Sequence, residues 1–363
     1  MMRMPMLLLF AFTLPDSQVA QSQTYIAQAS FSGNGDWLAL IVGRDNALNA
    51  LVLLDTATCA RSVLQMPDFH HYPEPVGQIA WNDTHSSFIV YLRARANTGD
   101  VSKYIGSFWA FDVATGAWRA LGAARQMRDK EAVPKCCYDS TDDTIRYFEP
   151  ASAQFVSLKC SLNRESILRL RVVPNHTAYE FFRGGVAALI GSGDQPRLNC
   201  DSFNDSIRKY DMSTGKVIWS ADIKRVVNVK LSPSATHFAA LQREPIRHEL
   251  AGGALYVIQP RVNTYTRVGD VSLHAGFSWR PDGGVLAYDS GLDGLVVFHM
   301  SDLRNEVVAP LPSHVWLPYW HPTTNELWAV REYCVVVRYS AGNWVDVVDI
   351  QKKRPKAGAA LNE

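Results

Sequence analysis

Hydrophobic residues along this chain occur in short runs that are rich in Val, Ile, Leu, Phe, Tyr and Trp. Gly, Pro, Asn and Asp separate these runs, and few stretches keep a helical period for three turns. Short apolar runs between turn-forming residues are typical of β-strands. The pattern therefore predicts an all-β chain.

The chain also repeats itself. One recurring unit is an apolar anchor residue followed by a polar turn and an apolar strand, and successive anchors lie 50, 150, 48 and 41 residues apart. The interval of 150 corresponds to three periods, so two further copies in this region are either degenerate or not recognisable by this unit. The anchors are Phe31, Trp81, Leu231, Trp279 and Trp320.

A second recurring unit is a hairpin in which an alternating strand, a tight turn and another strand follow each other. Asp opens several of these turns by bonding its own backbone, and Gly supplies a positive φ. Seven hairpins are predicted, at Leu51–Leu64, Phe108–Leu121, Ile145–Leu158, Ile207–Trp219, Leu255–Val268, Leu295–Val308 and Val335–Val348.

Four-stranded units of about 40–50 residues are the blades of β-propellers. We therefore predict an all-β propeller of seven four-stranded blades, in which the repeated tryptophans are structural wedges between blades. The strand Tyr25–Ser30 is expected to complete the last blade beside Val345–Ile350 and so close the ring. The segment Arg125–Ser140 shows few strand signals and is expected to be an insertion or long loop.

The copy at Phe277–Tyr288 contains Ser278-Trp279-Arg280-Pro281-Asp282-Gly283, and Leu231-Ser232-Pro233-Ser234 is a shorter version. It resembles the repeat of TolB-like and WD-repeat-like propellers, which carry a Ser-Pro-Asp-Gly turn between their first two strands. No Trp-Asp dipeptide ends a blade and no Gly-His opens one, so the chain departs from an orthodox WD-repeat protein. The resemblance implies a propeller fold and no particular activity.

Charge and the two ends refine this picture. The 363 residues carry a formal net charge of +1, which argues against a nucleic-acid partner. Residues 1–22 read as a signal peptide with cleavage before Gln23, residues 23–350 as a single propeller domain, and residues 351–363 as a basic tail. The mature chain is then secreted or periplasmic, with no transmembrane segment. The alternative is an N-terminal strand of a soluble intracellular protein.

Motifs for catalysis are missing from the sequence. It contains no Gly-x-Ser-x-Gly, no His-Glu-x-x-His, no Walker loop and no Cys-x-x-Cys, so we predict no catalytic, cofactor-binding or metal-binding residue. Six cysteines allow 15 full pairings. The adjacent Cys136 and Cys137 are either thiols on opposite faces of a strand or a disulfide or redox pair.

The favoured functional hypothesis is a non-catalytic platform that binds proteins, because loops on a rigid ring carry recognition. One form of this hypothesis is a subunit of a larger complex. The alternative is an exported hydrolase or lyase, or a binder of a small sugar-type ligand, that acts in the central funnel. Aromatic, His and Arg residues in exposed connections are the candidates for partner binding: His70, His71, Tyr72, Trp316, Tyr319, Arg331 and Tyr333.

Overall fold

The computed structural model describes residues 24–44, 47–82, 86–95, 103–128, 136–139, 143–149, 154–161, 164–169, 176–182, 186–191, 206–211, 214–221, 223, 226–234, 236–243, 253–271, 276–290, 293–310 and 315–352. The predicted signal peptide and residues 353–363 of the predicted tail lie outside these ranges, and both stay predictions. The described residues include no helix with the length and apolarity that crossing a membrane requires.

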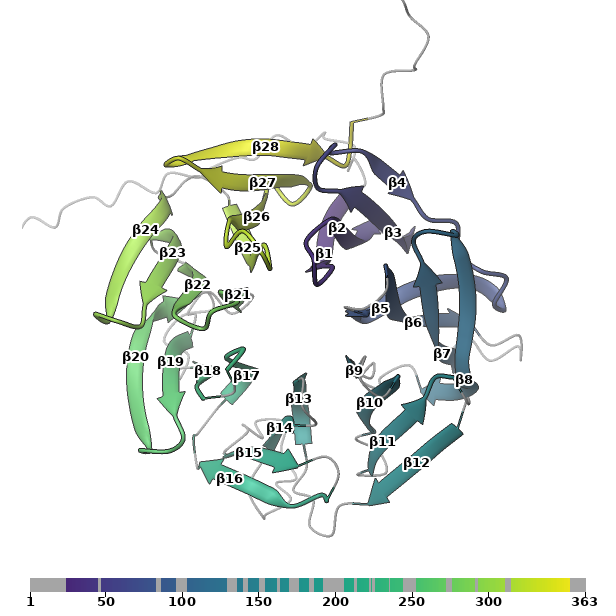
Figure 1. Ribbon diagram of the computed structural model, residues 1–363, viewed down its shortest axis with the longest axis horizontal. Coiled ribbons are helices and arrows are strands. Elements are labelled where there is room, and N and C mark those ends of the chain that lie inside the picture. The colour runs from purple at the N-terminus through teal and green to yellow at the C-terminus, as the bar shows by residue number, and fades with distance from the viewer. Residues whose placement is uncertain are drawn as a thin grey trace, which may run out of the picture.

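The described strands form seven four-stranded antiparallel sheets, each built from four consecutive strands. We call these sheets blades one to seven in chain order. Figure 1 shows them arranged around a common centre, with the first strand of each blade innermost and the fourth outermost. The predicted all-β propeller architecture of four-stranded sheets is confirmed.

The strands occupy four layers from the centre to the rim. The innermost layer contains β1 (Thr24–Phe31), β5 (His71–Asn82), β9 (Cys136–Asp139), β13 (His176–Phe182), β17 (Val226–Leu231), β21 (Phe277–Trp279) and β25 (Val315–Trp320). The second layer contains β2 (Trp37–Arg44), β6 (Ser87–Arg95), β10 (Thr144–Glu149), β14 (Val186–Gly191), β18 (Phe238–Arg243), β22 (Val285–Ser290) and β26 (Leu327–Arg331). The third layer contains β3 (Ala47–Asp55), β7 (Lys103–Asp112), β11 (Gln154–Lys159), β15 (Ser206–Asp211), β19 (Gly253–Gln259), β23 (Gly294–His299) and β27 (Val335–Ser340). The outermost layer contains β4 (Arg61–Val63), β8 (Ala117–Arg128), β12 (Arg164–Arg169), β16 (Val217–Ala221), β20 (Thr264–Val271), β24 (Arg304–Pro310) and β28 (Asn343–Asp349).

Two sequence-based expectations were wrong in detail. The N-terminal strand β1 pairs with β2 as the innermost strand of blade one, and not with Val345–Ile350 in the last blade. The segment Arg125–Ser140 is not a simple insertion, because β8 continues to Arg128 and β9 begins at Cys136. The strand β9 is only four residues long, which is too short for an alternating pattern to reveal it.

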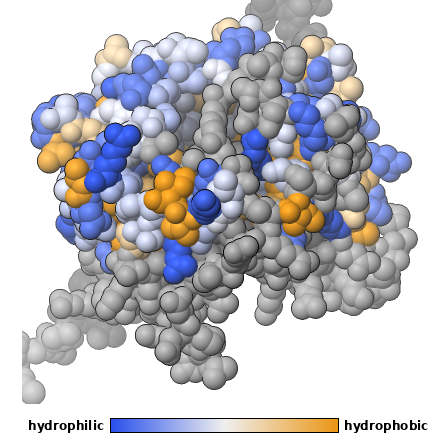
Figure 2. All heavy atoms as spheres, turned by 60° about the horizontal axis from the view of Figure 1, so that its bottom comes forward, coloured by the Kyte–Doolittle hydropathy of each residue, from blue (hydrophilic) through white to orange (hydrophobic). Residues whose placement is uncertain are grey.

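Hydrophobic burial follows the layers. The second and third strands are almost wholly buried, as in β22 and β23, whereas the outermost β24 is mostly exposed. Exposed apolar side chains lie mainly on the outermost strands and their turns, and Figure 2 shows hydrophobic residues in small separate groups among hydrophilic ones. Such scattered groups are normal for a soluble surface. The apolar cores lie between neighbouring blades.

The repeated tryptophans join neighbouring blades, as predicted. The Nε1 atom of Trp81 donates a hydrogen bond to the carbonyl of Ser30 at 2.9 Å. Trp279 donates likewise to Lys230 at 3.2 Å, and Trp320 donates to Ser278 at 3.0 Å. In each case the acceptor lies in the innermost strand of the preceding blade. The wedge therefore combines apolar packing with one satisfied polar contact.

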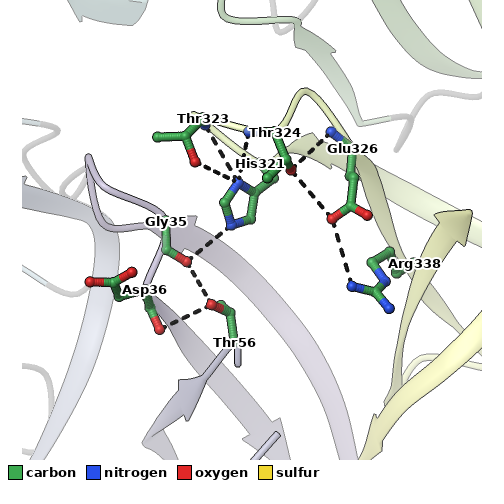
Figure 3. A network of polar contacts seen from close by, with 8 residues as sticks. All are labelled: Gly35, Asp36, Thr56, His321, Thr323, Thr324, Glu326 and Arg338. Carbon is green, nitrogen blue, oxygen red and sulfur yellow. Dashed lines mark hydrogen bonds and ion pairs between the residues drawn. The ribbon is translucent and has the colours of Figure 1, made fainter. Parts of the chain in front are cut away.

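His321 makes the equivalent link between blades seven and one (Figure 3). Its Nδ1 atom accepts from the amides of Thr323 and Thr324 at 3.4 and 3.3 Å, so the proton belongs on Nε2. Nε2 then donates to the Gly35 carbonyl at 3.1 Å. A Cβ at Gly35 would lie 2.1 Å from the imidazole of His321, which leaves no space for a side chain. The φ of +83° at Gly35 is a second reason why this position needs glycine.

Tryptophans of the outermost strands also donate hydrogen bonds to the preceding blade. Trp118 donates to the carbonyl of Gln65, and Trp344 donates to that of Val308, each across a blade boundary. Arg61 in β4 donates to the carbonyl of Asp349, which ends β28. Among the described strands, no sheet takes strands from both ends of the chain, so the ring is closed by side-chain contacts, core packing and the backbone hydrogen bond from the Ile26 amide to the Tyr333 carbonyl.

One buried carboxyl predicts a pH dependence of stability. Burial raises the pKa of Asp289 in β22 to about 6, from an ordinary value of 3.8. The folded chain therefore holds this proton more tightly than the unfolded chain, and stability falls as the pH rises from about 4 to about 6. The penalty persists above that window.

We expect Asp289→Asn to match the wild type at pH 4 and to be more stable at pH 7.5. Because Asp289 is only half-buried, solvent screens part of the penalty, and the expected gain is about 1–2 kcal/mol. Urea unfolding at both pH values measures it. Parallel stability curves for the two proteins would show that Asp289 carries no such penalty.

Candidate functional site

The strand order gives the ring two distinct faces. Turns between the first and second strands, and between the third and fourth, lie on one face, which we call the turn face. Turns between the second and third strands lie on the other face, where each blade's first strand also begins. We call this the start face. Six of the seven candidate residues for partner binding lie near it, and the seventh, Tyr319, lies towards the opposite end of β25.

One exposed candidate is Tyr333, in the turn between β26 and β27. Glu332 and Tyr333 have φ values of 49° and 65°, and the Cys334 amide donates to the Arg331 carbonyl at 3.2 Å. Two successive positive φ values are those of a type I′ turn, which normally uses Asn and Gly. Holding two other residues there costs about 1–2 kcal/mol each. Contacts with the surrounding structure therefore have to hold the exposed tyrosine in this turn.

Contacts on three sides hold this turn. The Tyr333 ring meets Trp316 edge-on with 5.2 Å between ring centres. The Tyr333 carbonyl accepts a hydrogen bond from the Ile26 amide of blade one at 2.7 Å. Arg331 forms an ion pair with Asp346 in β28. The structure therefore brings Trp316, Arg331 and Tyr333 together, with 57% of Tyr333 exposed.

Two buried polar atoms of β25 differ in how they are satisfied. Tyr319 is buried, its hydroxyl donates to the Ala329 carbonyl at 3.4 Å, and burial raises its pKa. Its side chain belongs to the core between blades seven and one. The buried Nε1 of Trp316 has no acceptor among the described residues. Among these two atoms, only the Tyr319 hydroxyl therefore has a hydrogen-bond partner in the described part of the chain.

The remaining candidates lie at the junction of blades one and two. His70 is exposed with φ of 51°, and its ring meets Phe69 edge-on at 4.8 Å between centres. His71 and Tyr72 begin β5, but their side chains lie outside the described residues. The structure therefore places these residues on the start face, at a different blade boundary from Tyr333.

The cysteine pair lies in the innermost strand of blade three. Cys136 is a buried thiol in the core between blades two and three. The side chain of Cys137 lies outside the described residues, so the disulfide or redox role stays a prediction. Within the part of the chain that the structure describes, no three His, Cys, Asp or Glu side chains gather closely enough to hold a metal ion.

Sequence reasoning missed two partners of the aromatic group. The Ile26 amide contacts Tyr333 although it lies about 300 residues earlier in the chain. The Asp346 carboxylate contacts Arg331 from a different strand, β28. Glu332 also has a positive φ, and nothing in the sequence indicated it because neither Gly nor Asn occupies that position. Only the polar run Arg331-Glu332-Tyr333 between two apolar strands signalled an exposed turn.

Comparisons with known proteins agree with the fold. The β-propeller domain of Cps50 (Swd1) from Myceliophteria thermophila matches with a TM-score of 0.55 and 14% identity, over 85% of this chain and 94% of that one. Hydrazine synthase from Kuenenia stuttgartiensis matches with a TM-score of 0.55 and 12% identity, over 88% and 94%. An oligogalacturonate lyase in complex with manganese matches with a TM-score of 0.53 and 11% identity, over 85% and 86%.

The sequence itself matches no family model and no curated protein. At identities of 11–14%, the structural matches show a shared propeller fold and nothing finer. Since propellers serve many unrelated functions, the function has to be argued from this chain's own surface.

Proposed function

We propose that this propeller is a protein-binding platform whose contact centre is the aromatic turn of blade seven. The observation that supports this is an exposed Tyr333, held by a strained turn and backed by Trp316. Tyr, Trp and Arg are the residues most enriched at the centres of protein interfaces. A fixed tyrosine loses little conformational entropy on binding, which favours affinity.

The surroundings of the turn also suit a protein surface. Arg331 is already paired with Asp346, so a partner can cover it without leaving a lone charge. The expected partner surface is therefore apolar, to match the exposed ring of Tyr333.

The test compares two tyrosine variants of the full-length protein in quantitative affinity capture from cells that naturally make it. Tyr333→Asn removes the ring and keeps a residue type that tolerates a positive φ. Tyr265→Asn is the matched control, because Tyr265 is 44% exposed on β20 of blade five. We expect Tyr333→Asn to reduce recovery of the partner at least ten-fold and Tyr265→Asn to leave it unchanged. Equal recovery by both variants would contradict the proposal.

A further inference from the structure

A second feature lies on the turn face, opposite the aromatic turn. A cavity of about 710 Å³ opens between blades two and three. This volume falls within the usual range of small-molecule sites. Ile89, Ala110 and Leu121 form an apolar wall, and polar side chains from both blades surround it.

A chain of hydrogen bonds from blade two to blade three orients one carboxylate in this cavity. Asn82 donates to the Tyr138 hydroxyl at 3.2 Å, and that hydroxyl donates to Oδ1 of Asp143 at 2.7 Å. Burial and the bond to Asp143 raise the pKa of Tyr138, so the phenol stays neutral and keeps its proton. Asp143 therefore presents a fixed negative charge.

The backbone holds Asp143 in place as well. Its φ is 51°, an uncommon conformation for a residue other than glycine, and its carbonyl accepts from the Cys160 amide at 2.9 Å. Such left-handed residues are concentrated at sites where side-chain placement matters.

A positive charge lines the same cavity from the other blade. Arg119 in β8 donates through one terminal nitrogen to the Cys160 carbonyl at 3.1 Å. Burial raises the pKa of the Cys160 thiol to about 12, with a further contribution from Asp143, so the thiol between these charges is neutral. Within the described part of the chain, no ion pair joins Arg119 to Asp143.

The comparable cavity between blades six and seven shows the contrast. Its volume is about 360 Å³, and its charged groups are paired with neighbours. Arg280 contacts Asp282 at 2.6 Å, and His299 lies 3.2 Å from Glu306. Paired charges leave little for a charged ligand to gain. The larger cavity differs because Arg119 and Asp143 face one space with no ion pair between them in the described part of the chain. Its third charged residue, Asp112, accepts hydrogen bonds from the amide and hydroxyl of Thr115 at 2.8 and 2.9 Å.

We propose that the cavity between blades two and three binds a short zwitterionic peptide. Asp143 binds the ammonium group, Arg119 binds the carboxylate, and the wall of Ile89, Ala110 and Leu121 takes an apolar side chain. Charge-assisted hydrogen bonds of this kind are about twice as strong as neutral ones. The volume leaves room for more than one amino-acid residue, which favours a di- or tripeptide over a free amino acid.

The first test measures binding to the full chain by isothermal titration calorimetry, with leucyl-leucine as the probe. The N-acetylated dipeptide lacks the ammonium group, and the dipeptide amide lacks the carboxylate. We expect saturable binding of leucyl-leucine and dissociation constants at least ten-fold higher for both blocked forms. No saturable binding, or equal binding of either blocked form, would overturn the proposal.

The second test locates the site by substitution. We expect Asp143→Asn and Arg119→Gln each to raise the dissociation constant for leucyl-leucine at least ten-fold. Asn tolerates the positive φ at position 143, and Arg119 is exposed, so both variants should fold. Arg304→Gln, on the outer strand of blade six, is the control and should bind like the wild type. Unchanged binding by the Asp143 and Arg119 variants would overturn the assignment.

Discussion

Trp328→Ala is expected to lower the free energy of unfolding by about 3–5 kcal/mol. Trp328 in β26 is 1% exposed and meets Phe31 edge-on with 5.2 Å between ring centres. It belongs to a core that contains residues of both blade one and blade seven. Because no shared strand joins these blades, this core supplies most of the apolar contact that closes the ring. A cavity here therefore weakens closure as well as packing.

Trp328→Phe separates the contribution of the ring from that of its N–H group. The buried Nε1 of Trp328 has no acceptor among the described residues, so losing it removes an unpaired donor. We expect Trp328→Phe to cost much less than Trp328→Ala, as measured by urea unfolding followed by circular dichroism. An alanine variant within 1 kcal/mol of the wild type would contradict the role of this core.

Gly253→Ala is expected to cost about 3 kcal/mol, the upper end of the usual range for overpacking. A Cβ at Gly253, the first residue of β19, would lie 2.2 Å from the backbone carbonyl oxygen of Gln242. That oxygen belongs to the paired strand β18, so relief requires the two strands to separate. No rotation of a side chain can provide it.

Gly43→Ala is the matched control for this prediction. There the added Cβ would meet the ring of Tyr25 at 2.3 Å, but Tyr25 is 37% exposed and its ring can rotate into solvent. We expect Gly43→Ala to cost less than about 1 kcal/mol in the same unfolding assay. Equal losses for the two variants would show that the backbone obstacle at Gly253 is not decisive.

The sequence predicted the repeat well because the repeated contacts are local in each blade. Trp81 and Trp279 occupy the same repeat position, and both bond to the preceding blade. The position of the N-terminal strand was predicted wrongly. The repeat has the same period whether this strand is counted as the first strand of blade one or as the last strand of blade seven, so the period cannot distinguish the two arrangements. Only the pairing of β1 with β2 decides it.

The two candidate sites show a similar division. The exposed Tyr333 could be predicted from a polar turn between apolar strands, but its contact with Trp316 joins residues from different strands. The cavity residues Asn82, Arg119 and Asp143 come from three separate segments, so no motif unites them. Their convergence follows from how neighbouring blades pack, which a single sequence does not specify.

The closure also has a mechanical consequence. Gln351 donates to the Thr24 carbonyl at 3.4 Å, so the first and last described segments meet at the boundary of blades seven and one. A force that pulls these two segments apart acts on core packing and on single, separate hydrogen bonds, whereas within a sheet several backbone hydrogen bonds resist together. Tyr333 lies across this boundary through its bond to Ile26. A partner bound there would stabilise the boundary between blades seven and one against separation.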